Sequence, residues 1–149
     1  MTTIGPDRCR ELLDEAPVGR LATVTGDGRP HLVPCCFVLV GDHLYSVVDG
    51  KPKSTSQLRR LDNIRANPAA ALLVDHYHDD WTQLWWVRAD GTARVIDPVA
   101  GLSIGDRVEY VAAVDALVES YPPYRETRPD GALVAIDIDR LSGWAWSDG

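Results

Sequence analysis

Residues 49–68 read Asp-Gly-Lys-Pro-Lys-Ser-Thr-Ser-Gln-Leu-Arg-Arg-Leu-Asp-Asn-Ile-Arg-Ala-Asn-Pro, a turn that leads from an apolar run into a segment with helical spacing. A helix start presents unpaired backbone N–H groups and the positive end of its dipole, and both favour an anion. Lys51 and Lys53 add positive charge, while Ser54, Thr55 and Ser56 can cap the helix or donate to a phosphate oxygen. The turn is therefore a candidate phosphate site, and the alternative is a capped surface helix with two solvated lysines.

The spacing of this stretch differs from Gly-x-x-x-x-Gly-Lys-Ser/Thr, so it is not a nucleotide P-loop. A helix is predicted over residues 55–66, with Leu58, Leu61 and Ile64 on its inner face, and Asn67-Pro68 ends it. Arg59 and Arg60 on this helix are further candidates for contact with an acidic group of a ligand. The alternative for both is a solvated helix face.

Composition and charge exclude some classes of function for this chain. The chain has 149 residues, which suits one domain over 1–149, and its net charge of −7 argues against general binding to nucleic acid or to anionic membranes. No apolar run is long enough to span a bilayer, and the N-terminus has no signal-peptide core, so we expect a cytoplasmic protein. Cys9, Cys35 and Cys36 lack metal-ligand spacing and are interpreted as buried thiols rather than nucleophiles. His76 and His78 sit two apart in a polar turn, where solvated histidines are commoner than metal ligands, so no metal site is predicted.

The periodicity predicts an α+β protein whose short connections require antiparallel strands. Pro34 within its strand implies an edge position or a bulge, and the apolar run 69–75 predicts a central strand buried on both faces. Asp90-Gly91 marks either a hairpin turn or a bulge in one long strand. Helices are predicted over 6–16, 55–66 and 106–121, a loop over 121–130, and strands over 18–25, 30–40, 44–48, 69–75, 81–89, 92–96 and 131–139, the last extended by 141–146.

Three motifs follow one another along most of the chain. The first is Gly19-Arg-Leu-Ala-Thr-Val-Thr-Gly-Asp-Gly-Arg-Pro-His-Leu-Val-Pro34. The second is Lys51-Pro-Lys53-Ser-Thr with Leu-Arg-Arg, Asn-Ile-Arg-Ala-Asn-Pro68 and Ala71-Leu-Leu-Val-Asp75. The third is Asp80-Trp81 followed by Gly91-Thr-Ala-Arg-Val95. Together they resemble the pyridoxamine 5'-phosphate oxidase-like split β-barrel proteins, and most closely the PPOX-class F420-dependent oxidoreductases.

This resemblance implies an antiparallel split β-barrel with peripheral helices, and a homodimer with two equivalent cofactor sites between the protomers. The cofactor implied is the deazaflavin coenzyme F420, with FMN as the alternative. By the same resemblance, a basic turn holds the cofactor phosphate, the second hairpin strand runs along the tricyclic ring, and an aromatic residue reaches the partner's site. These roles map onto Lys51, Pro52, Lys53, Ser54 and Thr55 for the phosphate, His31, Pro34 and Cys35 for the ring, and Trp81 for the partner's site.

The resemblance therefore predicts an oxidoreductase that transfers hydride between F420 and a small unsaturated or quinone-like substrate. An FMN-dependent oxidase or reductase, or a cofactor carrier without turnover, is the alternative. Because the cofactor itself carries the hydride, no catalytic residue of the chain is named.

Overall fold

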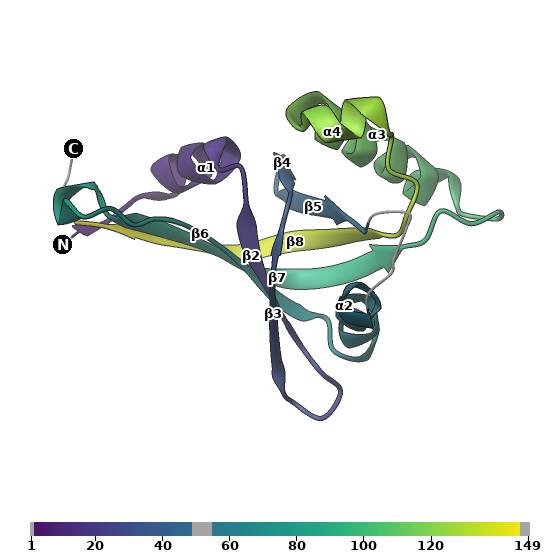
Figure 1. Cartoon of the computed structure of the whole chain (residues 1–149). Coiled ribbons are helices and arrows are strands. Elements are labelled where there is room, and N and C mark those ends of the chain that lie inside the picture. Colours follow the sequence, from purple (N-terminus) through teal and green to yellow (C-terminus); the bar gives the residue numbers. More distant parts are fainter. Residues whose placement is uncertain (1, 49–54, 147–149) are drawn as a thin grey trace.

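An antiparallel sheet of eight strands organises the computed structural model, which describes residues 2–48 and 55–146, with side chains in the second range described from residue 59 (Figure 1). The strand order is β3-β2-β6-β7-β8-β5-β4, and β1 pairs with β8. The strands are β1 (Thr2–Thr3), β2 (Gly19–Val24), β3 (Pro30–Cys35), β4 (Val38–Val40), β5 (His43–Val47), β6 (Ala69–His76), β7 (Trp85–Ile96) and β8 (Leu133–Ala145). The helices are α1 (Pro6–Glu15), α2 (Thr55–Ala66), α3 (Ile104–Ser120) and α4 (Pro122–Glu126), with one 3₁₀ turn, η1 (Trp81–Gln83).

The long pair β7–β8 is the middle of this sheet. It runs from Trp85 opposite Ala145 to Ile96 opposite Leu133, with a register shift at Asp90/Gly91. The bulge is therefore the correct alternative for Asp90-Gly91, and the hairpin is wrong. β7 has 12 residues and β8 has 13, because Asp139 is the extra residue of the bulge.

The predicted strand over 30–40 divides into two strands that lie at opposite edges of the sheet. β3 pairs with β2 at one edge, and β4 pairs with β5 at the other. Between them, the Tyr121 hydroxyl lies 3.1 Å from the backbone N of Phe37 and 2.9 Å from its carbonyl oxygen. Because Tyr121 occupies the groups that a continuous strand would pair, the chain leaves β3 here. Pro34 lies on the edge strand β3, as predicted.

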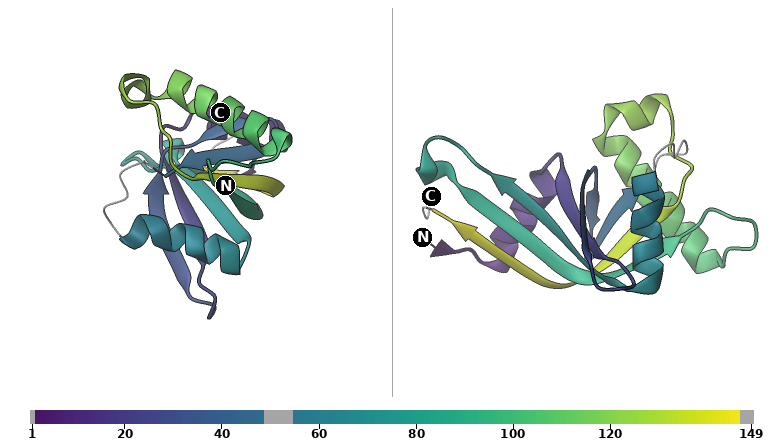
Figure 2. Two further views of the ribbon diagram at one scale, coloured as in Figure 1. Left: turned by 90° about the vertical axis from the view of Figure 1, so that its right-hand side faces the viewer. Right: turned by 60° about the horizontal axis from the view of Figure 1, so that its bottom comes forward.

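Two hydrophobic cores flank the curved sheet, and α2 and α3 lie on either side of the strands (Figure 2). The larger core contains residues of α1 and α2, and the smaller one lies under α3. The strand buried on both faces is the start of β8, where Val134 and Ile136 enter the larger core while Leu133 and Ala135 enter the smaller. The prediction of two buried faces for β6 is wrong, although β6 is central, because only its Leu72 and Val74 are fully buried.

Other differences from the sequence predictions are local. The segment 81–84 begins with the 3₁₀ turn η1, because Asp80 accepts hydrogen bonds from the backbone N and hydroxyl of Thr82. α3 starts at Ile104, since the Ser103 hydroxyl caps it by accepting from the Asp106 backbone N at 3.1 Å. The segment 121–130, predicted as a loop, contains α4, and β1 was not predicted. None of the helices in the described residues combines the length and the apolarity needed to cross a bilayer.

The bulge provides a test of the central pair. A Cβ at Gly91 would lie 2.2 Å from the Asp137 carbonyl oxygen, which is backbone and has little room to move. We expect Gly91→Ala to lower the free energy of unfolding by about 3 kcal/mol, as overpacking does. The measurement is urea unfolding followed by circular dichroism.

Gly105→Ala is the matched control, because a Cβ at this helical position meets no atom within 4 Å. We expect it to leave stability unchanged or to raise it by less than about 1 kcal/mol. Equal stabilities of the two variants would contradict the tight β7–β8 approach.

Candidate functional site

A cavity of about 240 Å³ lies where the ends of β3 and β5 meet α2. Val48 on its wall directly precedes the segment 49–54, and α2 directly follows that segment, so both flanks of the predicted phosphate turn reach this cavity. Its wall consists of Pro34, Cys35, Cys36, Ser46, Val47, Val48, Arg60 and Tyr124.

Arg60 is the one charged side chain among the described residues that line this cavity. It is only 9% exposed, and its Nε is buried with no hydrogen-bond partner in the part of the chain that the structure describes. A guanidinium always carries its charge, and burying a charge without a partner is costly. An anionic group bound in the cavity would satisfy this cation, so the residues present fit a phosphate or a carboxylate.

Cys35 does not neutralise Arg60. Burial raises the pKa of the Cys35 thiol, and its hydrogen bond with Ser46 and the charge of Arg60 oppose that rise only in part. The thiol is therefore protonated at neutral pH, and Arg60 keeps its full positive charge.

His31 lies on the same strand as Cys35 but does not line the cavity. It is paired with Thr23 of β2, and its Nδ1 is buried without a hydrogen-bond partner. Thr23 accepts a 3.1 Å hydrogen bond from Asn63 of α2, and both side chains are buried. This bond fixes α2 on the β2–β3 hairpin and so holds Arg60 in place.

Trp81 belongs to η1, which follows β6 at the end of that strand away from α2, close to the pairing of β1 with the end of β8. Its side chain is 59% exposed, and its ring packs edge-on against Trp146 with 5.8 Å between the centroids. Trp81 therefore does not reach the cavity of its own chain, and a role in a partner's site stays a prediction.

The remaining predicted ligands fall on the basic turn. Lys51, Pro52, Lys53 and Ser54 lie outside the described residues, and Thr55 is described only as the first residue of α2.

Five residues of the cavity wall were not predicted as ligands: Cys36, Ser46, Val47, Val48 and Tyr124. Ser46 has a signal in the sequence, because it is a polar residue inside the apolar run 44–48. Tyr124 has none, since it reaches the cavity only through the fold of α4.

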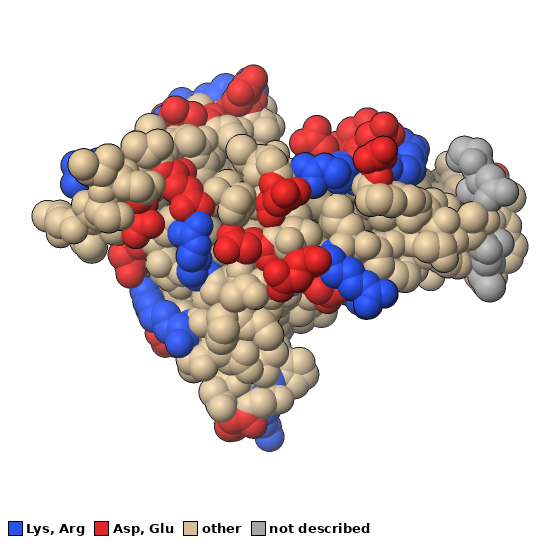
Figure 3. Space-filling model, turned by 180° about the vertical axis from the view of Figure 1, so that it is seen from behind, with Lys and Arg blue, Asp and Glu red and all other residues tan. Residues whose placement is uncertain are grey.

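A larger hollow of about 530 Å³ lies between the ends of α1 and α3. Three carboxylates, Asp14, Glu15 and Glu119, line it together with apolar residues of the segment 37–39. These negative charges disfavour a phosphate, so the smaller cavity at Arg60 is the better anion site. On the face drawn in Figure 3, acidic and basic side chains are intermixed, and this face has no continuous basic surface.

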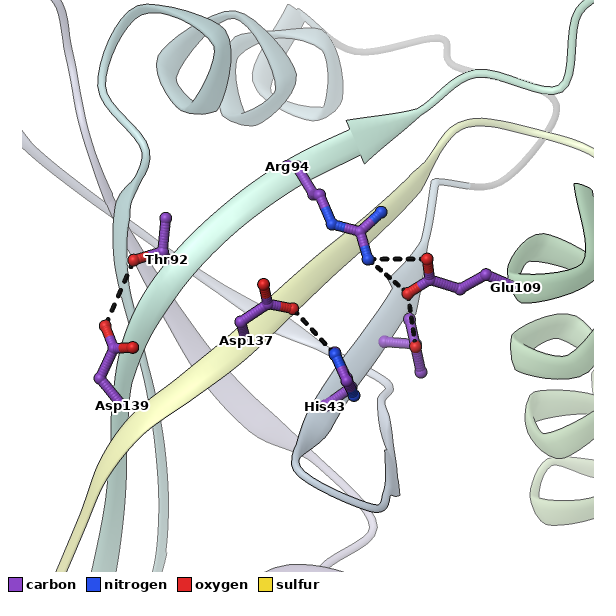
Figure 4. Close-up of polar contacts among 7 residues, drawn as sticks. His43, Thr92, Arg94, Glu109, Asp137 and Asp139 are labelled. Carbon is purple, nitrogen blue, oxygen red and sulfur yellow. Dashed lines mark hydrogen bonds and ion pairs between the residues drawn. The ribbon is translucent and has the colours of Figure 1, made fainter. Parts of the chain in front are cut away.

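A second polar cluster ties α3 to the sheet (Figure 4). Arg94 of β7 donates to Glu109 of α3 at 2.7 Å, and the Tyr45 hydroxyl of β5 donates to the same carboxylate at 2.6 Å. Burial of Glu109 opposes its ionisation, but the hydrogen bonds from Arg94 and Tyr45 outweigh it and lower the pKa of this carboxyl. In contrast to Arg60, these charges have partners, so we interpret the cluster as structural.

Comparisons with known proteins agree with this fold. A family model described as pyridoxamine 5'-phosphate oxidase matches residues 6–145, nearly the whole chain. A search of functionally curated proteins finds no match. The predicted α+β split-barrel fold is thereby confirmed.

Solved structures of similar fold include proteins that are named for binding different cofactors. An FAD-binding protein from Mesorhizobium loti superposes with a TM-score of 0.70 at 24% identity, covering 95% of each chain. An FAD-binding protein from Mycobacterium smegmatis has a TM-score of 0.66 at 18% identity, covering 98% of this chain and 100% of that one. The heme storage protein of Vibrio cholerae has a TM-score of 0.67 at 15% identity, covering 94% and 93%. At these identities the likeness establishes the fold.

The Glu109 cluster predicts an acid-dependent loss of stability. Because the pKa of Glu109 is lower in the folded protein, its contribution is full above the ordinary value of 4.5 and disappears as the pH falls through the folded-state pKa. We expect Glu109→Gln to cost about 2 kcal/mol at pH 7, with the difference from the wild type shrinking below pH 4.5. Urea unfolding at several pH values measures it.

Glu11→Gln is the control for this experiment, because Glu11 forms an exposed pair with Arg8. Its effect should stay within about 0.5 kcal/mol at every pH. A difference between wild type and Glu109→Gln that stays constant down to pH 3 would contradict the assignment.

The buried Nε of Arg60 has no hydrogen-bond partner among the described residues. We therefore predict that Arg60 lowers the unfolding free energy of the ligand-free protein. Arg60→Met keeps most of the apolar stem and removes the buried charge, so we expect ligand-free protein to gain about 1 kcal/mol of unfolding free energy at low salt. Arg59→Met, at an exposed position on the same helix, should change it by less than about 0.5 kcal/mol. A clear loss of stability in Arg60→Met would show that the guanidinium already has a partner.

Proposed function

Because the chain belongs to the pyridoxamine 5'-phosphate oxidase family, we propose that it is an oxidoreductase that uses a phosphorylated flavin-type cofactor. The cofactor we propose is the deazaflavin coenzyme F420, and the substrate is a small unsaturated or quinone-like molecule. The observation that carries the proposal is the buried guanidinium of Arg60, whose Nε has no hydrogen-bond partner within residues 2–48 and 59–146, in a cavity whose wall residue Val48 precedes the predicted phosphate turn.

Anion binding is the first step of the argument. Lys51 and Lys53 belong to the segment that joins Val48, on the cavity wall, to α2. The start of α2 adds unpaired N–H groups and the positive end of its dipole. With Arg60, these groups supply several positive charges for a phosphate and for further acidic groups of a ligand.

The size of the cavity supports a shared site. At about 240 Å³ it is smaller than the roughly 300–1,000 Å³ of typical ligand pockets, so we assign it the anionic end of a tricyclic cofactor. The ring then lies against other surfaces. We propose that a second copy of the chain supplies them in a homodimer, with the exposed Trp81 as the partner's contribution.

The cofactor, when bound, supplies the hydride chemistry. The chain's own residues bind and orient it: Arg60 and the basic turn hold its anionic groups, while Pro34 and Cys35 form the adjoining wall. The buried Val48 and Cys35 exclude water from this end of the site. No side chain here is assigned as a proton donor.

The choice between cofactors rests on two observations. The motifs resemble the F420-dependent subgroup, and Arg60 adds positive charge beyond the two lysines, which suits the acidic tail of F420. The likeness to two FAD-binding proteins supports FMN as the alternative. The likeness to a heme storage protein makes a cofactor carrier without turnover the third candidate.

Titration of the purified protein with F420 and with FMN, followed by fluorescence, tests the proposal. We expect tighter binding of F420, and a loss of at least about tenfold in affinity for Lys51→Ala/Lys53→Ala and for Arg60→Gln, because each removes charge-assisted hydrogen bonds. Oxidation of reduced F420 in the presence of a quinone then separates an enzyme from a carrier.

Arg8→Ala/Arg128→Ala is the charge-matched control, since it also removes two positive charges and neither residue lines the cavity. Its affinity should stay within about twofold of the wild type, because exposed charges are screened by salt. Unchanged affinity in the double-lysine variant would refute the phosphate turn, and yellow protein with tighter FMN binding would favour FMN.

A further inference from the structure

Two adjacent thiols, Cys35 and Cys36, line the cavity at Arg60. Cys35 is 8% exposed, whereas Cys36 is only partly buried and lies just after the end of β3. The third thiol, Cys9, is fully buried in the larger core, where it contacts the Ile4 carbonyl oxygen. Cys36 is therefore the thiol that a small molecule in the cavity reaches most easily.

The charge of the cavity favours anionic molecules. The buried Nε of Arg60 has no hydrogen-bond partner among the described residues, and none of those that line the cavity carries a carboxylate. The cavity has a volume of about 240 Å³. An anion that binds the guanidinium there lies in the cavity that both thiols line.

Because Cys36 and Arg60 line the same cavity, an anionic disulfide bound there can react with a thiol. A thiolate attacks a disulfide faster when the protein holds that disulfide beside it. The bimolecular reaction then becomes effectively unimolecular. Burial keeps Cys35 protonated, as its raised pKa indicates, which leaves Cys36 as the attacking group.

We propose that Cys36 is a modification site for small disulfides that carry a carboxylate, which Arg60 binds and directs. The Cys36 sulfur, after its proton passes to solvent, attacks one sulfur of the disulfide. A new S–S bond forms, the original S–S bond breaks, and the other half leaves as a thiolate. This replaces the interpretation of Cys36 as an inert thiol, and it does not depend on the proposed cofactor.

The test compares dithiodiglycolate, which carries two carboxylates, with the neutral bis(2-hydroxyethyl) disulfide. Mass spectrometry of peptides follows mixed-disulfide formation at each cysteine over time. We expect modification at Cys36 ahead of Cys35 and Cys9. We also expect Arg60→Gln to lower the rate ratio of the anionic to the neutral reagent by about tenfold, the effect of one charge-assisted hydrogen bond.

Arg60→Lys and Arg59→Gln are the controls. The first keeps the charge in the cavity and should retain most of the ratio, and the second removes an exposed charge on the same helix and should leave the ratio within about twofold. Circular dichroism confirms that each variant is folded. Modification of Cys9 first, or an unchanged ratio in folded Arg60→Gln, would overturn the proposal.

The thiol experiment and the cofactor titration can fail independently of each other. Failure of F420 and FMN to bind, with the thiol selectivity intact, would refute the proposed function alone. Cofactor binding that needs Arg60, with no charge selectivity at Cys36, would refute this inference alone.

Discussion

The fold depends on the β7–β8 ladder, in which 12 residues of β7 face 13 of β8. Gly91 allows this pair to continue through a bulge, because a side chain there would collide with the backbone of β8. The first residues of β8 then fill both cores at once, with Val134 on one face and Leu133 on the other. The sheet continues outward from this pair on both sides, through β6 and β2 to β3 and through β5 to β4, so the two cores are joined by one pair of strands.

The candidate site differs from the structural polar cluster at Glu109 in how its buried charge is satisfied. Where Glu109 satisfies Arg94 at the foot of α3, no described residue satisfies Arg60, although Arg60 is the more buried cation. A buried charge without a partner costs stability, and the proposed anion would offset that cost. The contrast between the two arginines therefore separates a structural cluster from the candidate anion site.

The sequence predicted well what depends on neighbouring residues. Helix α2 with its buried Leu61 and Ile64, the edge position of Pro34, and the alternatives at Asp90-Gly91 all follow from spacing and local backbone rules. Predictions failed where a distant side chain decides the outcome. The break after Cys35 is fixed by Tyr121, 84 residues after the Phe37 backbone that it binds.

Candidate site residues divide in the same way. Pro34, Cys35 and Arg60 could be proposed from motifs, and the structure brings these three to one cavity. Tyr124 and Ser46 join them only through tertiary packing, and Trp81 lies beyond the far end of β6, away from the Arg60 cavity. The Tyr121 contact that breaks the strand also has a mechanical effect. Its hydroxyl contacts the Pro17 carbonyl oxygen as well as Phe37, so the start of α4 is tied to the link between β3 and β4, next to Cys36. A displacement of α4 would therefore reach the cavity wall by two routes, directly through Tyr124 and indirectly through Tyr121 and Phe37.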